Sequence, residues 1–167
     1  MKYHRENDGR KAPVAYTQQQ AKVKVCRYCA YQERSHQEVR QKLADMGFYG
    51  DDAEEIIADL IGEGYLNEER FARAYAGGKF RVKKWGRVKI RQGLKQHRVS
   101  DYCMRAGLSE IDPEEYWQTL RALAQQRWEK EKGQQAYIRR AKAARYLVGR
   151  GYEQDLVMEA LREAEGT

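Results

Sequence analysis

Long apolar runs and proline are scarce in this sequence. It has no stretch of 18 or more apolar residues, so nothing in it resembles a membrane-spanning helix. Only 2 of its 167 residues are proline, while Ala, Leu, Glu, Lys, Arg and Gln are abundant, which favours helices. The first 20 residues lack the apolar segment of a secretory signal. We therefore expect a cytoplasmic protein that does not associate with membranes.

Cysteine is too rare to build a disulfide framework or a zinc ribbon. Cys26 and Cys29 form a single C-x2-C pair, and Cys103 stands alone, so no second pair completes a metal site. We expect three reduced, half-buried thiols in helices and no bound metal.

Catalytic motifs are missing as well. The sequence contains no G-x-S-x-G, no G-x4-G-K-[S/T] and no H-E-x-x-H. The acidic run 51–55 falls at a predicted helix start, where carboxylates interact favourably with the helix dipole. We predict that the protein is not an enzyme and uses no cofactor.

Charge is distributed unevenly along the chain. Residues 26–69 contain 4 Lys/Arg and 11 Asp/Glu, a net charge of −7, whereas residues 70–150 contain 21 Lys/Arg and 7 Asp/Glu, a net charge of +14. This separation indicates a partner with its own charge pattern, and nucleic acid or a nucleoprotein is the leading candidate. A solvated basic face that only keeps the protein soluble is the alternative.

The basic side chains concentrate on one predicted helix. From Arg81 to Arg98 no Asp or Glu interrupts the Lys and Arg residues. Like charges four residues apart destabilise a helix by a few tenths of a kcal/mol each, and Gly93 costs about 1 kcal/mol more relative to Ala. A helix with these costs is expected to gain stability by binding an anion.

Capping signals predict where the helices begin. Ser35 and Asp51 each precede a Glu by three residues, as in a capping box, and Asp112 is followed by a proline at the first helical position. Asn67 and Ser100 are single N-cap candidates.

The apolar pattern repeats with a period near 50 residues. Segments that begin at Val39, Ile90 and Ala143 align with offsets of 51 and 53 residues. The leucines that coincide are Leu43, Leu94 and Leu147. A helical pattern with this period predicts an all-α fold of three tandem three-helix repeats forming an elongated, curved array. The predicted parts are a disordered tail (1–15), an acidic unit 1 (16–66), a basic unit 2 (67–111) and a basic unit 3 with a short C-terminal tail (112–167).

The alignment also indicates where the basic residues point. Ile90 and Leu94 take inward positions, so the charged residues of the same helix are expected to face outward, and the equivalent helix of unit 3 would extend them into one stripe. The predicted nucleic-acid-binding residues are Lys79, Arg81, Lys83, Lys84, Arg87, Lys89, Arg91, Lys95, Arg98, Arg139, Arg140, Lys142 and Arg145.

Three stretches carry a likeness to a known family, and the resemblance as a whole extends over roughly residues 20–164. They are ERSHQEVRQKLADMGF, LIGEGYLNEERFARAYAGGKF and KWGRVKIRQGLKQHRVS, of which the second is the most specific. Together they resemble the RecX family of regulators of the RecA recombinase. The resemblance implies a non-enzymatic protein that binds the groove of a RecA–single-stranded DNA filament. It would mostly inhibit, repressing strand exchange, ATP hydrolysis and co-protease activity in DNA repair and recombination.

Two hypotheses remain open beside this one. The chain could be a general nucleic-acid-binding helical module without a recombinase partner, or an adaptor that holds an acidic protein. Under the leading hypothesis we expect a monomer that binds single-stranded DNA mainly within the filament. Its acidic unit would contact basic recombinase loops through Glu54, Glu55 and Asp59.

Overall fold

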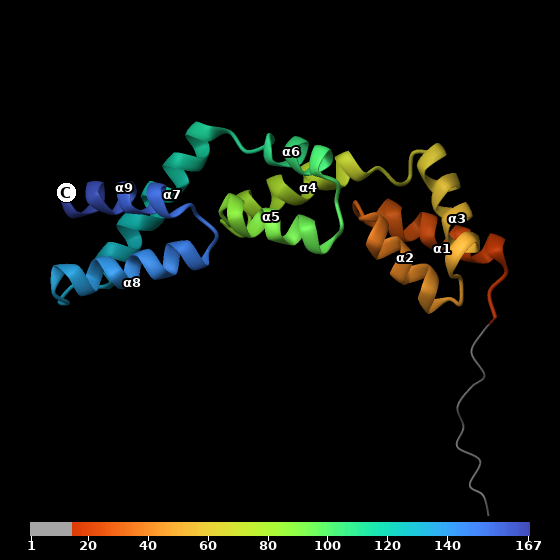
Figure 1. Ribbon diagram of the computed structural model, residues 1–167, viewed down its shortest axis with the longest axis horizontal. Helices are drawn as coiled ribbons and strands as arrows, with labels where there is room; N and C mark the ends of the chain where they lie inside the picture. Colours follow the sequence, from red (N-terminus) through yellow and green to blue (C-terminus); the bar gives the residue numbers. More distant parts are fainter. Residues whose placement is uncertain (1–14) are drawn as a thin grey trace, which may run out of the picture.

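The computed structural model describes residues 15–167, which fold into nine helices without a strand. The helices are α1 (Gln18–Tyr31), α2 (His36–Asp45), α3 (Gly50–Gly62), α4 (Glu68–Arg81), α5 (Arg87–Gln96), α6 (Asp101–Leu108), α7 (Pro113–Lys130), α8 (Ala136–Gly149) and α9 (Gln154–Glu165). They form an elongated row of three groups, α1–α3, α4–α6 and α7–α9 (Figure 1). The predicted all-α array of three-helix repeats is confirmed. The tail predicted over 1–15 lies, except for Ala15, outside the described residues.

Most of the predicted caps are present, and one is wrong. The side chains of Ser35, Asn67, Ser100 and Asp112 each accept a hydrogen bond from the backbone N–H three residues later. Asp51 is not an N-cap, because α3 begins one residue earlier at Gly50. The Asp51 and Asp52 carboxylates lie instead in the first turn of α3, where they still complement the helix dipole.

The repeated apolar positions form two separate cores. Leu43, Leu94 and Leu147 are each fully buried, as the alignment predicts. The core of α1–α3 is closed on itself, whereas the residues from Phe71 to Ala164 form one continuous core shared by α4–α6 and α7–α9. Units 2 and 3 therefore fold around common apolar surface, and unit 1 folds around its own.

The junction between units 2 and 3 is made largely by the backbone. At the start of α5, the Gly86 N–H donates to the Arg150 carbonyl and the Val88 N–H donates to the Gly151 carbonyl, each at 2.9 Å. Both acceptors lie in the loop after α8. The Tyr152 hydroxyl donates to the carbonyl of Lys84, also at 2.9 Å. Unit 3 thereby supplies the acceptors that an isolated α5 would lack at its N-terminus.

The junction between units 1 and 2 depends on side chains. The Ser35 hydroxyl and His97 Nδ1 lie 3.0 Å apart, and Arg70 Nε lies 2.5 Å from a Glu33 carboxylate oxygen. Within unit 2, the ring of the same His97 packs edge-on against Phe71 with a centroid separation of 5.1 Å. With separate cores and few contacts, this is the weaker of the two junctions.

Candidate nucleic-acid interface

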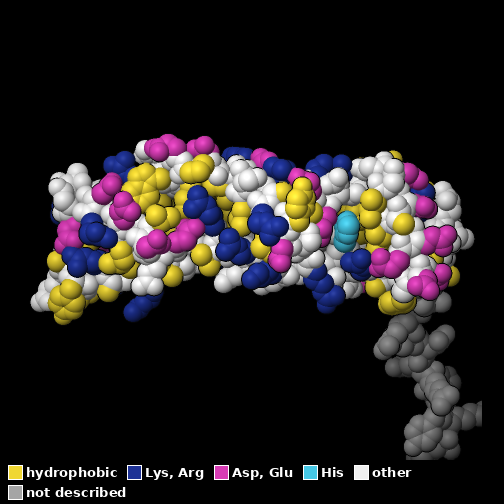
Figure 2. Space-filling view, turned by 45° about the horizontal axis from the view of Figure 1, so that its top comes forward, with side chains coloured by type: hydrophobic (Ala, Val, Ile, Leu, Met, Phe, Trp, Pro, Cys, Tyr) yellow, Lys and Arg dark blue, Asp and Glu magenta, His cyan; other side chains and the backbone are white. Residues whose placement is uncertain are grey.

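A basic face runs from the last turn of α4, across α5, to the turn that follows α5. Its members are Lys79, Arg81, Lys83, Lys84, Lys89, Arg91, Lys95 and Arg98. None of them forms an ion pair with any residue that the structure describes. Figure 2 shows Lys and Arg side chains gathered over the middle of the molecule, with acidic side chains more frequent toward its ends. Eight cations without internal counterions create a positive field that attracts a polyanion.

Packing between α4 and α5 turns this face outward. Ile90 and Leu94 are fully buried on the inner side of α5, and Gly93 lies between them against α4. A Cβ at Gly93 would overlap the hydroxyl of Tyr75. The glycine that weakens α5 as an isolated helix therefore permits the close approach that positions α5, while Arg91 and Lys95 remain exposed.

An aromatic ring lies within the basic face. Trp85 is half-buried against the shared core. The ammonium groups of Lys79 and Lys89 lie 4.9 and 4.4 Å from the centre of its ring. Cation–π attraction of this kind holds the long lysine side chains near the ring. It therefore reduces the conformational entropy that these side chains lose when they bind a ligand.

Arg87 does not belong to this face, and the expectation that it points outward is wrong. Its guanidinium lies 3.8 Å from the centre of the Tyr116 ring and 3.3 Å from a Glu153 carboxylate oxygen. The Tyr116 hydroxyl accepts from the Arg87 backbone N–H at 3.1 Å and donates to Glu153 at 2.5 Å. Burial and the Glu153 hydrogen bond raise the pKa of Tyr116 well above its ordinary value. No local sequence signal reveals this network, because Tyr116 and Glu153 follow Arg87 by 29 and 66 residues.

Helix α8 does not continue the basic face as a free stripe, which corrects the expectation for three of its four basic residues. Arg139 covers the Trp128 ring at 3.8 Å and donates to the Trp128 carbonyl at 2.7 Å. Arg140 donates to both carboxylate oxygens of Glu165, at 2.7 and 2.6 Å. The remaining two side chains differ: Lys142 lies 3.8 Å from a Glu131 oxygen, and Arg145 is exposed without an ion pair among the described residues.

The three acidic residues predicted to contact the recombinase all lie on α3, and two of them have internal partners. Arg40 Nε donates to Glu54 at 2.6 Å, which holds the pKa of the Glu54 carboxyl below its usual value. Lys22 Nζ lies 3.4 Å from Asp59. Glu55 is exposed and has no ion-pair partner among the described residues. Their role as partner contacts stays a prediction.

The cysteines are chemically quiet in residues 15–167. All three are free thiols, and burial raises the pKa of Cys29 to about 11. No group of three or more His, Cys, Asp or Glu side chains in that range could hold a metal ion. The described helices also include none long and apolar enough to cross a bilayer.

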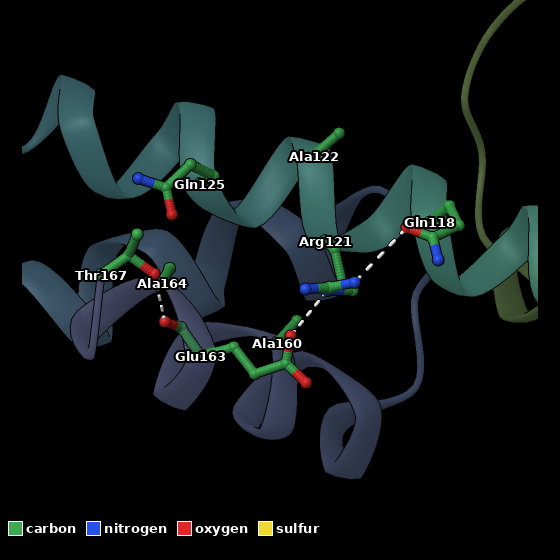
Figure 3. A pocket seen from close by; sticks show the side chains of 8 residues that line it. All are labelled: Gln118, Arg121, Ala122, Gln125, Ala160, Glu163, Ala164 and Thr167. Carbon is green, nitrogen blue, oxygen red and sulfur yellow. Dashed lines mark hydrogen bonds and ion pairs between the residues drawn. The ribbon is translucent and has the colours of Figure 1, made fainter.

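A hollow of about 520 Å³ lies between α7 and α9 (Figure 3), and no residue of the basic face lines it. Arg121 lies on one of its walls and Glu163 on the other, joined by an ion pair of 2.6 Å. The residues that line it include neither cysteine nor histidine; they are Gln118, Arg121, Ala122, Gln125, Ala160, Glu163, Ala164 and Thr167.

Models of one protein family match all three units of the chain. They describe the first, second and third three-helix domains of RecX and match residues 21–60, 67–108 and 114–161. The "Regulatory protein RecX" of Prosthecochloris aestuarii is 33% identical over 136 residues, which cover 81% of this chain and 87% of that protein. The protein of the same name from Clostridium perfringens (strain 13) is 32% identical over 131 residues. That match covers 77% of this chain, which spans 61% of the length of the Clostridium protein.

Solved structures agree with the fold. The crystal structure of RecX from Lactobacillus salivarius superposes with a TM-score of 0.81 at 19% identity, covering 90% of this chain and 97% of that one. A crystal structure of a second regulatory protein RecX gives a TM-score of 0.78 at 21% identity, covering 87% and 71% of the two chains. The three matched domains, the sequence identity and the helical array together show that this chain belongs to the RecX family.

Proposed function

We propose that this chain regulates the RecA recombinase by binding the groove of its filament on single-stranded DNA and repressing strand exchange, ATP hydrolysis and co-protease activity. The RecX family assignment and the name of its relatives, regulatory proteins, support a regulatory task. In this proposal the protein acts as a cytoplasmic monomer, is not an enzyme and needs no cofactor. Its effect comes from occupying the filament.

The observation that carries this proposal is the contrast in charge pairing across the molecule. Half of the described basic residues of units 1 and 3 have a carboxylate partner, such as Arg40 with Glu54 and Arg140 with Glu165. The eight residues of the basic face have none among the described residues. A basic side chain without a carboxylate partner in the protein is free to contact a phosphate backbone and to displace the cations bound there.

Each charged part of the molecule receives a role in this proposal. Lys89, Arg91 and Lys95 contact DNA phosphates within the filament. Binding through these contacts weakens as the salt concentration rises, because each phosphate contact releases counterions. Glu55, an exposed carboxylate of α3 without an ion pair among the described residues, contacts basic recombinase loops, with Glu54 and Asp59 beside it. Arg145 adds one positive charge from unit 3.

The direct test is the ATP hydrolysis rate of RecA on single-stranded DNA while this protein is added in increasing amounts. Inhibition at ratios well below one molecule per recombinase is the expected result, because a filament regulator acts on many subunits at once. Unchanged hydrolysis, together with tight binding to bare single-stranded DNA, would instead indicate a general nucleic-acid-binding module.

A pair of matched variants locates the effect on the surface. Replacing Lys89, Arg91 and Lys95 by Ala removes three charges without ion pairs among the described residues from α5, where Arg91 and Lys95 are exposed and Lys89 is half-buried, and should abolish inhibition at these ratios. The control replaces Lys130, Lys132 and Arg162, exposed residues of unit 3 without ion pairs among the described residues, and should inhibit like the original protein. Equal inhibition by both variants would refute the role of the basic face. Binding of RecA without DNA would favour the adaptor hypothesis.

A further inference from the structure

The turns between the second and third helices of the three units differ at one backbone position. Each turn closes with an N–H donating to the carbonyl five residues earlier, from Phe48, Val99 and Tyr152 to the three repeated leucines. The residue before each donor has a positive φ. In units 1 and 3 it is glycine, Gly47 at 88° and Gly151 at 99°, whereas in unit 2 it is Arg98 at 56°.

This left-handed conformation brings the Cβ of an L-residue close to the backbone, and it is therefore costly for arginine and free of penalty for glycine. A Cβ at Gly47 would meet no atom within 4 Å. Neighbouring atoms therefore do not exclude a side chain at this position of unit 1, where only the backbone conformation disfavours one, yet unit 2 has a side chain in spite of that conformation. Among residues 15–167 just one other non-glycine residue has a positive φ, Lys84 at 56°, and it too is basic and belongs to the basic face.

Nothing within the described molecule explains why Arg98 is there. Its guanidinium is exposed and makes no hydrogen bond or ion pair with any described residue. It lines a groove of about 240 Å³ between unit 2 and the α2–α3 side of unit 1, together with Arg40 and Gln41. Because Arg40 is neutralised by Glu54, Arg98 is the uncompensated charge of this groove.

We propose that Arg98 occupies its strained position because its guanidinium binds a nucleic-acid phosphate at the groove between units 1 and 2. This inference rests on the proposed function and deepens it. The phosphate track on α5 then extends past the end of that helix to the junction with unit 1. Retained backbone strain is characteristic of residues whose side chains act on a ligand. A guanidinium suits this task because its planar donors match two phosphate oxygens.

The inference predicts opposite effects on stability and on binding. Arg98→Gly relieves the strain and removes the charge, and Arg98→Asn tolerates the same conformation without the charge. Arg98→Gly should raise the melting temperature by about 2–4 °C. Both variants should bind about tenfold more weakly to a labelled single-stranded oligonucleotide, bare at low salt or assembled with RecA. Gly47→Arg, which places arginine at the equivalent position of unit 1, should lower the melting temperature by a similar amount.

The other outcomes are equally informative. A lower melting temperature for Arg98→Gly would make Arg98 a structural residue and overturn the inference. If the Arg98 variants bind more weakly to the RecA-assembled oligonucleotide but not to the bare one, Arg98 contacts the recombinase and not the DNA. That result would likewise overturn the inference. Lys95→Ala, measured in parallel, separates the two proposals: if Lys95→Ala weakens binding and Arg98→Gly does not, only the inference about Arg98 fails. If neither variant weakens binding, the basic face itself has no such role.

Discussion

Helices α5 and α8 occupy equivalent positions in units 2 and 3 and have similar numbers of basic residues, yet they present different charge to solvent. On α5, Lys89, Arg91 and Lys95 have no carboxylate partner among the described residues. On α8, Arg139 and Arg140 are each held by a partner from α7 or α9. The number of basic residues in a segment therefore does not determine its external field, because the field depends on which charges the fold has already paired.

The comparison is sharpest for single arginines on the two helices. Arg139→Ala should lower the free energy of unfolding by about 2 kcal/mol, because it removes a charge-assisted hydrogen bond and the packing on Trp128. Arg91→Ala, on the exposed side of α5, should change it by less than about 0.5 kcal/mol. Urea denaturation measures both, and similar losses would contradict the assignment of Arg139 to the fold and Arg91 to binding.

The placement of α5 can be disturbed at its contact with α4. Gly93→Ala should lower the free energy of unfolding by about 1–2 kcal/mol, because its Cβ overlaps Tyr75. The matched control is Gly78→Ala in α4, where a Cβ meets no atom within 4 Å and better helix propensity should add up to about 1 kcal/mol. If Gly93→Ala is stabilising like its control, α5 does not pack as described.

Helix α8 can be made to resemble α5 by removing a partner charge. Glu165→Gln leaves the Arg140 guanidinium without its carboxylate partner. Because this ion pair is partly exposed, stability should decrease by less than about 1 kcal/mol. Binding to the RecA–DNA filament should become tighter and more dependent on salt, since one more cation is available. Fluorescence anisotropy at several salt concentrations measures this, and an unchanged salt dependence would place α8 outside the interface.

The smallest effect expected is a dependence of stability on pH. Burial lowers the pKa of His36 below its usual value of about 6.5, so the folded protein binds this proton less readily than the unfolded chain. The contribution of His36 to stability is therefore present above pH 6.5 and is lost as the pH falls through the lowered pKa. His36→Gln should reduce the loss of stability between pH 7.5 and 5.5 in thermal unfolding.

The sequence predicts the helical array well because its signals are local. Helix caps such as Ser35 and Asp112 act over three residues, and the repeated leucines reveal the inward positions by spacing alone. The pairing of charges could not be predicted in this way. Arg140 meets Glu165 across 25 residues and Arg87 meets Glu153 across 66, so these contacts exist only once the helices have packed.

The role of Gly93 could not be predicted from the sequence either. In the sequence it is only a weak point of a basic helix, whereas in the structure it allows α4 and α5 to approach at Tyr75. The left-handed backbone of Arg98 was equally hidden, because a basic residue gives no sign of positive φ. Both features become visible when the equivalent positions of the three units are compared in space.

The most direct test of the account is the salt dependence of binding to RecA-coated single-stranded DNA, compared between two triple variants. Replacing Lys89, Arg91 and Lys95 by Ala should reduce the slope of log affinity against log salt by about 2, because three phosphate contacts are lost. Replacing Arg139, Arg140 and Lys142 by Gln should leave that slope unchanged. An equal reduction in both variants, or a reduction only in the α8 variant, would contradict the claim that the unpaired face of α5 carries the interaction.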